Sequence, residues 1–239
     1  MINLKTEKIH IKCSDWVWTL FQAIQISIIG LMTWSLLSED WLKLGFSGQY
    51  YDLRWTGSLN SVHKGLGGLK GTSYSDLFKA YCSRSDLSQD IQINESTWCK
   101  MFASLWVSEI VYVLFEVVAM LLMVSWTISL RLALKTNKLR RVPGICSANG
   151  AWVLHVAGFI TWMVLSRANF SGDCNKESDG KSPPKLCALT GPTIALALAI
   201  IMPILAISYP FLIRCLTKSV ETQSAIPKQP EGKMIEVTV

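Results

Sequence analysis

The chain has 239 residues, of which 50% are hydrophobic and only 17% charged, and its formal net charge is +6. This composition excludes an ordinary soluble domain and is typical of a protein with several membrane spans. Crossing the hydrocarbon core takes roughly 20 mostly apolar residues in a helix. Four segments meet that requirement, so the sequence predicts an all-α membrane protein with a bundle of four transmembrane helices.

The first predicted span, 16–37, contains no charged residue and follows a basic N-terminal segment, 1–15. A basic start followed by an apolar segment is also the pattern of a signal peptide. This apolar segment is too long for one, however, and no small-residue cleavage site follows it. We therefore expect a retained transmembrane helix, with Gln22 and Gln25 as polar residues inside it.

The first outer loop, 38–102, is too long to lack structure in a compact protein. Its first part contains WLKLGF and YYDLRW, in which apolar and polar residues alternate as in short β-strands. We predict a small extracellular β-sheet from this loop, with Gly57 at a bulge or tight turn. Trp55 has two interpretations: it covers the sheet, or it anchors the loop among lipid headgroups.

The second predicted span, 103–130, contains Glu109 and Glu116, and the third, 145–166, contains His155. A charged group deep in a membrane is costly, so Glu116 should face the bundle interior and have a partner there. At about 1.5 Å per residue, Glu116 and His155 reach similar depths in two antiparallel helices. Three interpretations stay open: a structural hydrogen-bond network, an ion or proton pathway, and a contact with the helices of a partner channel.

The distribution of basic residues predicts the orientation. The connection between spans two and three, 131–144, contains five basic residues and no acid, whereas charges nearly balance in both outer loops, 38–102 and 167–187. Short cytoplasmic loops are enriched in Lys and Arg. We therefore place both termini and this connection in the cytoplasm and the protein in the plasma membrane.

The fourth span is 188–213, and the polar tail, 214–239, is expected to be disordered.

Small residues recur in the fourth span at Gly191, Ala195 and Ala199, a spacing that lets helices approach closely, and we expect them to pack within the bundle.

Each outer loop contains a glycosylation sequon, which begins at Asn94 in the first loop and at Asn169 in the second. The sequons therefore agree with the predicted orientation.

The seven cysteines also sort by the predicted side of the membrane. Four lie in the outer loops, where disulfides persist, and we expect the loop-local pairs Cys82–Cys99 and Cys174–Cys187 because they need the least rearrangement of the chain. Three lie at cytoplasmic span ends, where they are candidates for palmitoylation or plain buried thiols: Cys13, Cys146 and Cys215.

The loop residues Trp41, Trp55 and Gly57, in W…W-T-G-S-L, followed by two cysteines and a shorter second loop, resemble the pattern of the claudin superfamily. That group includes claudins, the peripheral myelin protein group and calcium-channel gamma subunits. The sequence departs from the motif at Leu59, near the position of its second tryptophan, and in the wider spacing of Cys82 and the next cysteine. The resemblance implies an outer sheet that acts in adhesion or as part of a channel's accessory subunit.

The sequence contains no enzyme motif, so we expect no catalytic residue, cofactor or metal site, and no nucleic-acid partner. The expected partners are the lipid bilayer and either a membrane protein in the same membrane or a like protein on a neighbouring cell. The end of the tail, with Val237 and Val239, has the pattern of a PDZ ligand, and an unread tail is the alternative. The alternative function is a pore or transporter that uses the region around Glu116.

Overall fold

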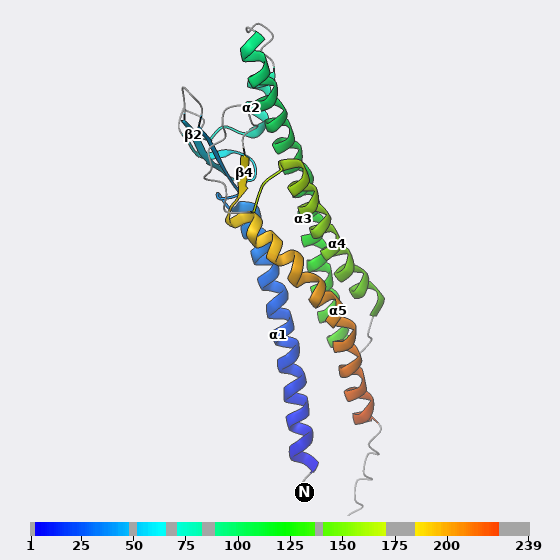
Figure 1. The fold of residues 1–239 in the computed structure, drawn as a ribbon. Coiled ribbons are helices and arrows are strands. Elements are labelled where there is room, and N and C mark those ends of the chain that lie inside the picture. The colour runs from blue at the N-terminus through cyan, green and yellow to red at the C-terminus, as the bar shows by residue number, and fades with distance from the viewer. Residues whose placement is uncertain are drawn as a thin grey trace, which may run out of the picture.

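The computed structural model describes residues 3–47, 52–65, 71–82, 89–136, 141–170 and 185–224. Four long helices lie side by side, and a small antiparallel sheet sits at the end of the bundle opposite the N-terminus of the chain (Figure 1). We call this end the sheet end. The long helices contain four segments that are apolar and long enough to cross a membrane: Thr19–Leu37, Trp98–Ser129, Gly144–Ser166 and Thr190–Phe211. The predicted four-helix membrane fold is confirmed, and the chain is a multi-pass membrane protein.

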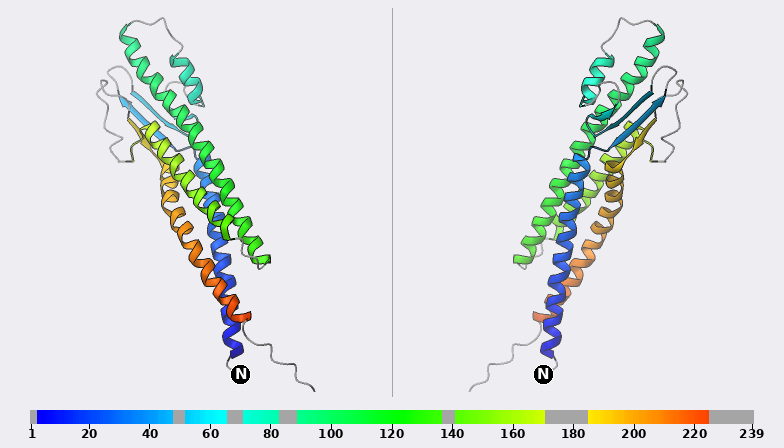
Figure 2. Two further views of the ribbon diagram at one scale, coloured as in Figure 1. Left: turned by 90° about the vertical axis from the view of Figure 1, so that its right-hand side faces the viewer. Right: turned by 90° about the vertical axis from the view of Figure 1, so that its left-hand side faces the viewer.

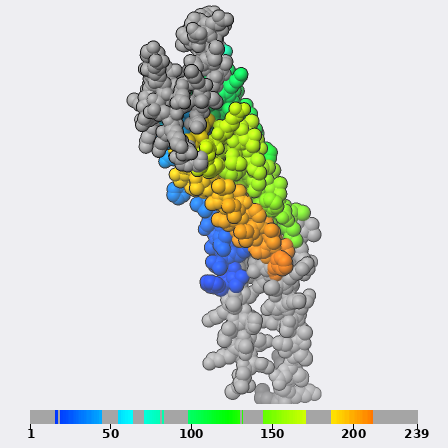
Figure 3. Space-filling model, in the orientation of Figure 1, coloured from blue at the N-terminus to red at the C-terminus, as the bar shows by residue number. Residues whose placement is uncertain are grey.

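The four long helices are α1 (Asn3–Leu37), α3 (Gln89–Thr136), α4 (Arg141–Ser166) and α5 (Thr190–Ser224). Around the bundle, α1 packs against α3, α3 against α4, α4 against α5, and α5 against α1. The space-filling view shows side chains of α5 filling the strip between α1 and α4 (Figure 3). The four helices therefore form a closed ring.

Each long helix buries one stripe and leaves the opposite face apolar and exposed. On α3 the buried stripe repeats every three to four residues: Phe102, Leu105, Ser108, Tyr112, Glu116, Ala119, Met123 and Trp126. Leu114 and Leu121 of the same helix are 61% and 64% exposed. An exposed apolar face is what a lipid-covered helix needs, because lipid tails solvate it.

The sheet consists of β1 (Leu42–Ser47), β2 (Asp52–Gly57), β3 (Val62–Gly65) and β4 (Lys185–Ala188), in the order β3-β2-β1-β4. The strands predicted from WLKLGF and YYDLRW are confirmed as β1 and β2. The predicted small sheet from the first outer loop is confirmed, and the second loop adds one more strand, β4, which pairs with β1. Alternation over four residues is too short a signal to identify such a strand.

Helix α3 is much longer than the span predicted at 103–130. It has 48 residues, which is about 72 Å at about 1.5 Å per residue, against a hydrocarbon core of about 30 Å. Its first part rises beside the sheet, together with the short helix α2 (Tyr74–Cys82), as both views of Figure 2 show. In the later half of the first loop, the described residues are therefore mostly helical, in 74–82 and from 89 onward. We call the sheet, α2 and this first part of α3 the sheet domain.

Apolar residues around the predicted start of the second span serve the sheet as well as the bundle. Phe102, just before the predicted span, and Leu105, inside it, are buried in one cluster with the sheet residues Leu44 and Trp55. Hydropathy alone therefore does not separate the core of the sheet domain from the membrane span.

The tail that is predicted to be disordered from 214 is helical as far as Ser224, where α5 ends. Residues 225–239 lie outside the described part of the chain.

Candidate functional site

The structure brings Glu116 of α3 and His155 of α4 together in the middle of the bundle. The His155 Nδ1 atom lies 2.7 Å from Glu116 Oε2, and the Nε2 atom lies 2.9 Å from the carbonyl oxygen of Ala195 on α5. The side chains of Glu116 and His155 are both fully buried. The imidazole therefore joins three helices by two hydrogen bonds, at the shared depth that the sequence predicts.

The two bonds fix the number of protons on the pair. A carbonyl oxygen only accepts, so His155 Nε2 carries a proton and donates it to Ala195. One further proton must lie between Nδ1 and Glu116 Oε2, because two lone pairs at this separation would repel. Whichever atom holds that proton, the pair is neutral overall. Neutrality removes most of the cost of burying the two groups, since an uncompensated charge is far more expensive than a polar group.

The other polar residues singled out in the spans do not join this pair. Gln25 is buried, and its side-chain oxygen accepts a 3.4 Å hydrogen bond from Thr127 of α3. Glu109 lies two turns nearer the sheet end on α3 and is only half-buried. Within the part of the chain that the structure describes, no group of three side chains could hold a metal ion.

Trp41 is the residue that seats the sheet on the bundle. It is fully buried, and its indole N–H donates a 2.6 Å hydrogen bond to the carbonyl oxygen of Ser35 in α1. Its ring meets Tyr112 and Trp162 edge-on, at centroid distances of 5.1 and 4.9 Å. A Cβ atom at Gly191 would lie 2.5 Å from the indole nitrogen, so the ring lies directly on the backbone of α5. We call Tyr112, Trp162 and Gly191 the Trp41 socket.

The backbone at Trp41 connects this socket to two strands. Its N–H donates to the carbonyl oxygen of Gly57 at 2.8 Å, and its carbonyl oxygen accepts from Leu189 at 3.0 Å. Gly57 ends β2, and Leu189 follows β4. The N–H of Gly191 also donates to Asp40, at 2.9 Å. The position of the sheet is thus tied directly to the position of the socket.

Trp55 and Gly57 belong to the core of the sheet domain. Trp55 is 2% exposed, in agreement with the first of its two interpretations, and its ring lies 6.1 Å from that of Tyr74 in α2. The Tyr74 hydroxyl lies beside the Cα atom of Gly57 and donates to the carbonyl oxygen of Ser58 at 3.0 Å. Any Cβ at Gly57 would overlap that hydroxyl and the Trp55 ring. This is the physical reason for a glycine two residues after the tryptophan.

Tyr74 is a structural residue that the sequence analysis missed. No motif surrounds it, and its position is visible only after α2 is placed beside the sheet. Burial raises the pKa of its hydroxyl well above the ordinary value, and the negative charge of Glu109 raises it further. The hydroxyl therefore stays protonated and remains a hydrogen-bond donor throughout the neutral range.

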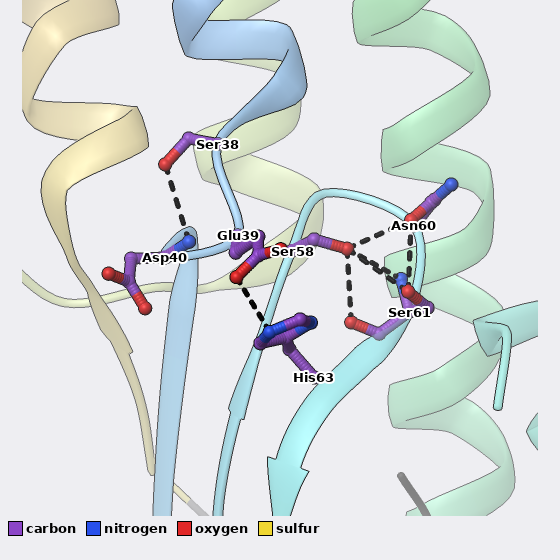
Figure 4. Close-up of polar contacts among 7 residues, drawn as sticks. All are labelled: Ser38, Glu39, Asp40, Ser58, Asn60, Ser61 and His63. Carbon is purple, nitrogen blue, oxygen red and sulfur yellow. Dashed lines mark hydrogen bonds and ion pairs between the residues drawn. The ribbon is translucent and has the colours of Figure 1, made fainter. Parts of the chain in front are cut away.

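A polar cluster surrounds the turn between β2 and β3 at the base of the sheet (Figure 4). The Ser58 hydroxyl donates to Asn60 Oδ1 at 2.8 Å and lies 3.1 Å from the Ser61 hydroxyl. The His63 Nε2 atom lies 2.6 Å from Glu39 Oε2, just after the end of α1. The register shifts between Thr56 and Gly57, and a shift of this kind redirects side chains.

The described cysteines agree with the predicted pairing in part. A disulfide joins Cys82 at the end of α2 to Cys99 of α3, as predicted. Cys187 is also disulfide-bonded, but Cys174 lies outside the described residues, so their pairing stays a prediction. Cys146 is a free, exposed thiol. The remaining two cysteines lie in the chain segments of α1 and α5: Cys13 and Cys215.

The two sequon asparagines occupy different backbone settings. Asn94 lies within α3, in the part that belongs to the sheet domain. Asn169 follows α4, and its backbone bonds to Leu186 and Ala188 of β4 at 2.8 and 2.9 Å. Whether glycans are attached at either residue stays a prediction.

Comparison with known proteins assigns no family to the chain. No protein-family model matches it, and no curated protein matches it. The resemblance to the claudin superfamily therefore rests on Trp41, Trp55, Gly57 and the order of the spans.

Proposed function

We propose that the chain is a non-enzymatic, claudin-like membrane protein that acts through protein–protein contacts made by its sheet domain. One observation carries this proposal: the sheet domain is a folded unit held rigidly on the bundle. Its core is continuous with the core of the bundle at the sheet end, and α2 is fixed to α3 by a disulfide. Connecting four spans needs no such structure, whereas a docking surface needs a rigid support.

The face of the sheet that points away from the core, where Lys43 and Thr56 are half-buried, is the proposed contact surface. One face, with Leu44, Trp55 and Leu186, is buried in the core. The strand register puts Lys43 and Thr56 opposite each other on the other face, because successive residues of a strand point to opposite sides. A partner that binds there would meet an antiparallel surface whose position is fixed by Trp41.

Site-specific photocrosslinking tests this proposal. A photoreactive amino acid at Lys43 should capture a partner protein on intact cells, whereas the same group at Val153, an exposed residue on the apolar face of α4, should not. Capture within one cell supports an accessory subunit of a channel, and capture only between neighbouring cells supports adhesion. Equal labelling from both positions, or none from Lys43, would refute docking through the sheet.

The plasma membrane, cytoplasmic termini and a PDZ contact at Val239 belong to the same proposal. The five basic residues in 131–144 support this orientation. A pore or transporter around Glu116 is the alternative. The neutral, fully buried Glu116–His155 pair supports the hydrogen-bond network instead, since a conducting site must exchange ions or protons with water. An ion flux in liposomes that Glu116→Gln abolishes would favour the pore.

A further inference from the structure

The buried pair and the Trp41 socket use the same three helices. Glu116, His155 and Ala195 hold the pair together on α3, α4 and α5. The socket residues lie nearer the sheet end, about one turn away on α3 and α5 and about two turns away on α4: Tyr112 before Glu116, Gly191 before Ala195, and Trp162 after His155. The two sites are therefore stacked along the bundle axis.

We propose that the Glu116–His155 pair is a positioning element for the sheet domain. By holding α3, α4 and α5 at a fixed separation, it sets the width of the socket that receives Trp41 and thereby the position of the sheet. The inference rests on the proposed function in one respect, since the sheet whose position the pair sets is the proposed contact surface.

The chemistry of the pair suits this role. An imidazole is a rigid plane whose two nitrogens lie on different sides, so His155 acts as a strut between α3 and α5. Its two hydrogen bonds, of 2.7 and 2.9 Å, are short and directional. Between helices in a membrane the hydrophobic effect gives little attraction, and packing and hydrogen bonds determine their separation. The pair is fully buried, so no solvent competes for these bonds.

The socket is sensitive to the separation that the pair sets. The Trp41 ring packs edge-on against Tyr112 and Trp162 and lies directly on the bare backbone of Gly191. Ser35 Oγ also donates to the carbonyl oxygen of Gly191 at 3.1 Å, which fastens α1 to the same point. A change of helix spacing would therefore displace Trp41 and break its backbone bonds to β2 and to the residue after β4.

Hydrogen–deuterium exchange on the full chain in nanodiscs tests the proposal without any partner. The reporter amides are those of Trp41, Leu189 and Gly191, whose bonds fasten the sheet to the bundle. The reference amide is that of Tyr74, which donates to Asn60 inside the sheet domain. We expect Glu116→Leu to speed exchange at the reporters on the order of tenfold, by local opening, and to leave the reference unchanged.

Two substitutions of His155 divide the effect between its bonds. Asn places a polar atom near the position of Nδ1 and keeps the bond to Glu116, whereas Gln reaches the position of Nε2 and keeps the bond to Ala195. We expect His155→Asn to speed exchange at Leu189 and Gly191. Asn149→Leu is the matched control on the same helix, because Asn149 is exposed and bonds only within α4.

The outcomes separate this proposal from docking itself. Reporter amides that stay as protected as in the wild type, or that open together with the Tyr74 amide, would overturn the positioning role. If Glu116→Leu is not recovered folded, the exchange of His155→Asn at Leu189 and Gly191 decides in the same way. Failure of photocrosslinking from Lys43 would instead refute docking and leave the exchange result standing.

Discussion

Gly57→Ala is the most informative substitution in the sheet domain. The added methyl group would overlap the Tyr74 hydroxyl and approach the Trp55 ring and the carbonyl oxygen of Ser61. If Tyr74 moves, its buried hydroxyl loses the bond to Ser58, which costs about 1–3 kcal/mol. Forcing an extra carbon into a packed core costs typically about 1–3 kcal/mol more. We therefore expect a loss of about 2–6 kcal/mol in the stability of the sheet domain.

A double-mutant cycle with Tyr74→Phe identifies the cause of that loss. Removing the hydroxyl makes room for the methyl group, so the two substitutions together should cost less than the sum of their separate effects. The apparent melting temperature of the purified protein measures all four species. Gly30→Ala is the matched control, because a Cβ there has no neighbour within 4 Å. Additive costs, or an effect of Gly30→Ala as large as that of Gly57→Ala, would refute the overlap with Tyr74.

Three further predictions concern the same domain and its disulfides. Trp55→Ala removes a large core side chain and should cost about 3–5 kcal/mol, so the variant should show immature glycans and low surface labelling while its helices still insert. Because the pKa of Tyr74 is raised in the folded protein, its contribution to stability is complete below the ordinary tyrosine pKa of about 10 and is lost as the pH rises through the folded-state pKa. The melting temperature of the wild type should therefore fall in strong alkali more than that of Tyr74→Phe. Non-reducing peptide mapping should recover Cys174 joined to Cys187; a bond to another cysteine would contradict loop-local pairing.

The sequence predicts the parts of this fold that follow from local patterns. Alternation in WLKLGF and YYDLRW predicted the two strands β1 and β2, and hydropathy predicted four spans. It could not identify β4, whose four residues gain their structure from pairing with β1. It predicted the second span but not the full length of α3, because hydropathy reports apolar residues and the first part of this helix, QDIQINEST, is mostly polar.

The site shows the same division between local and long-range information. Glu116 and His155 could be paired from helix rise alone, because both lie in regular helices of opposite direction. The acceptor on α5 could not be predicted, since every residue offers a carbonyl oxygen and only packing selects Ala195. Likewise, Trp41 and Gly57 stand out in the sequence, but Tyr74, which explains Gly57, has no local signature.

Burial inside the membrane makes the pair a better spacer than a switch. To change its charge, the pair would have to gain or lose a proton and leave a net charge in the bundle centre, which is costly in a membrane interior. In the neutral state both nitrogens of His155 are satisfied, and small helix movements would stretch two bonds at once. The same feature that opposes conduction, a neutral pair whose bonds join α3, α4 and α5, therefore favours a fixed position for Trp41 and for the sheet that it seats.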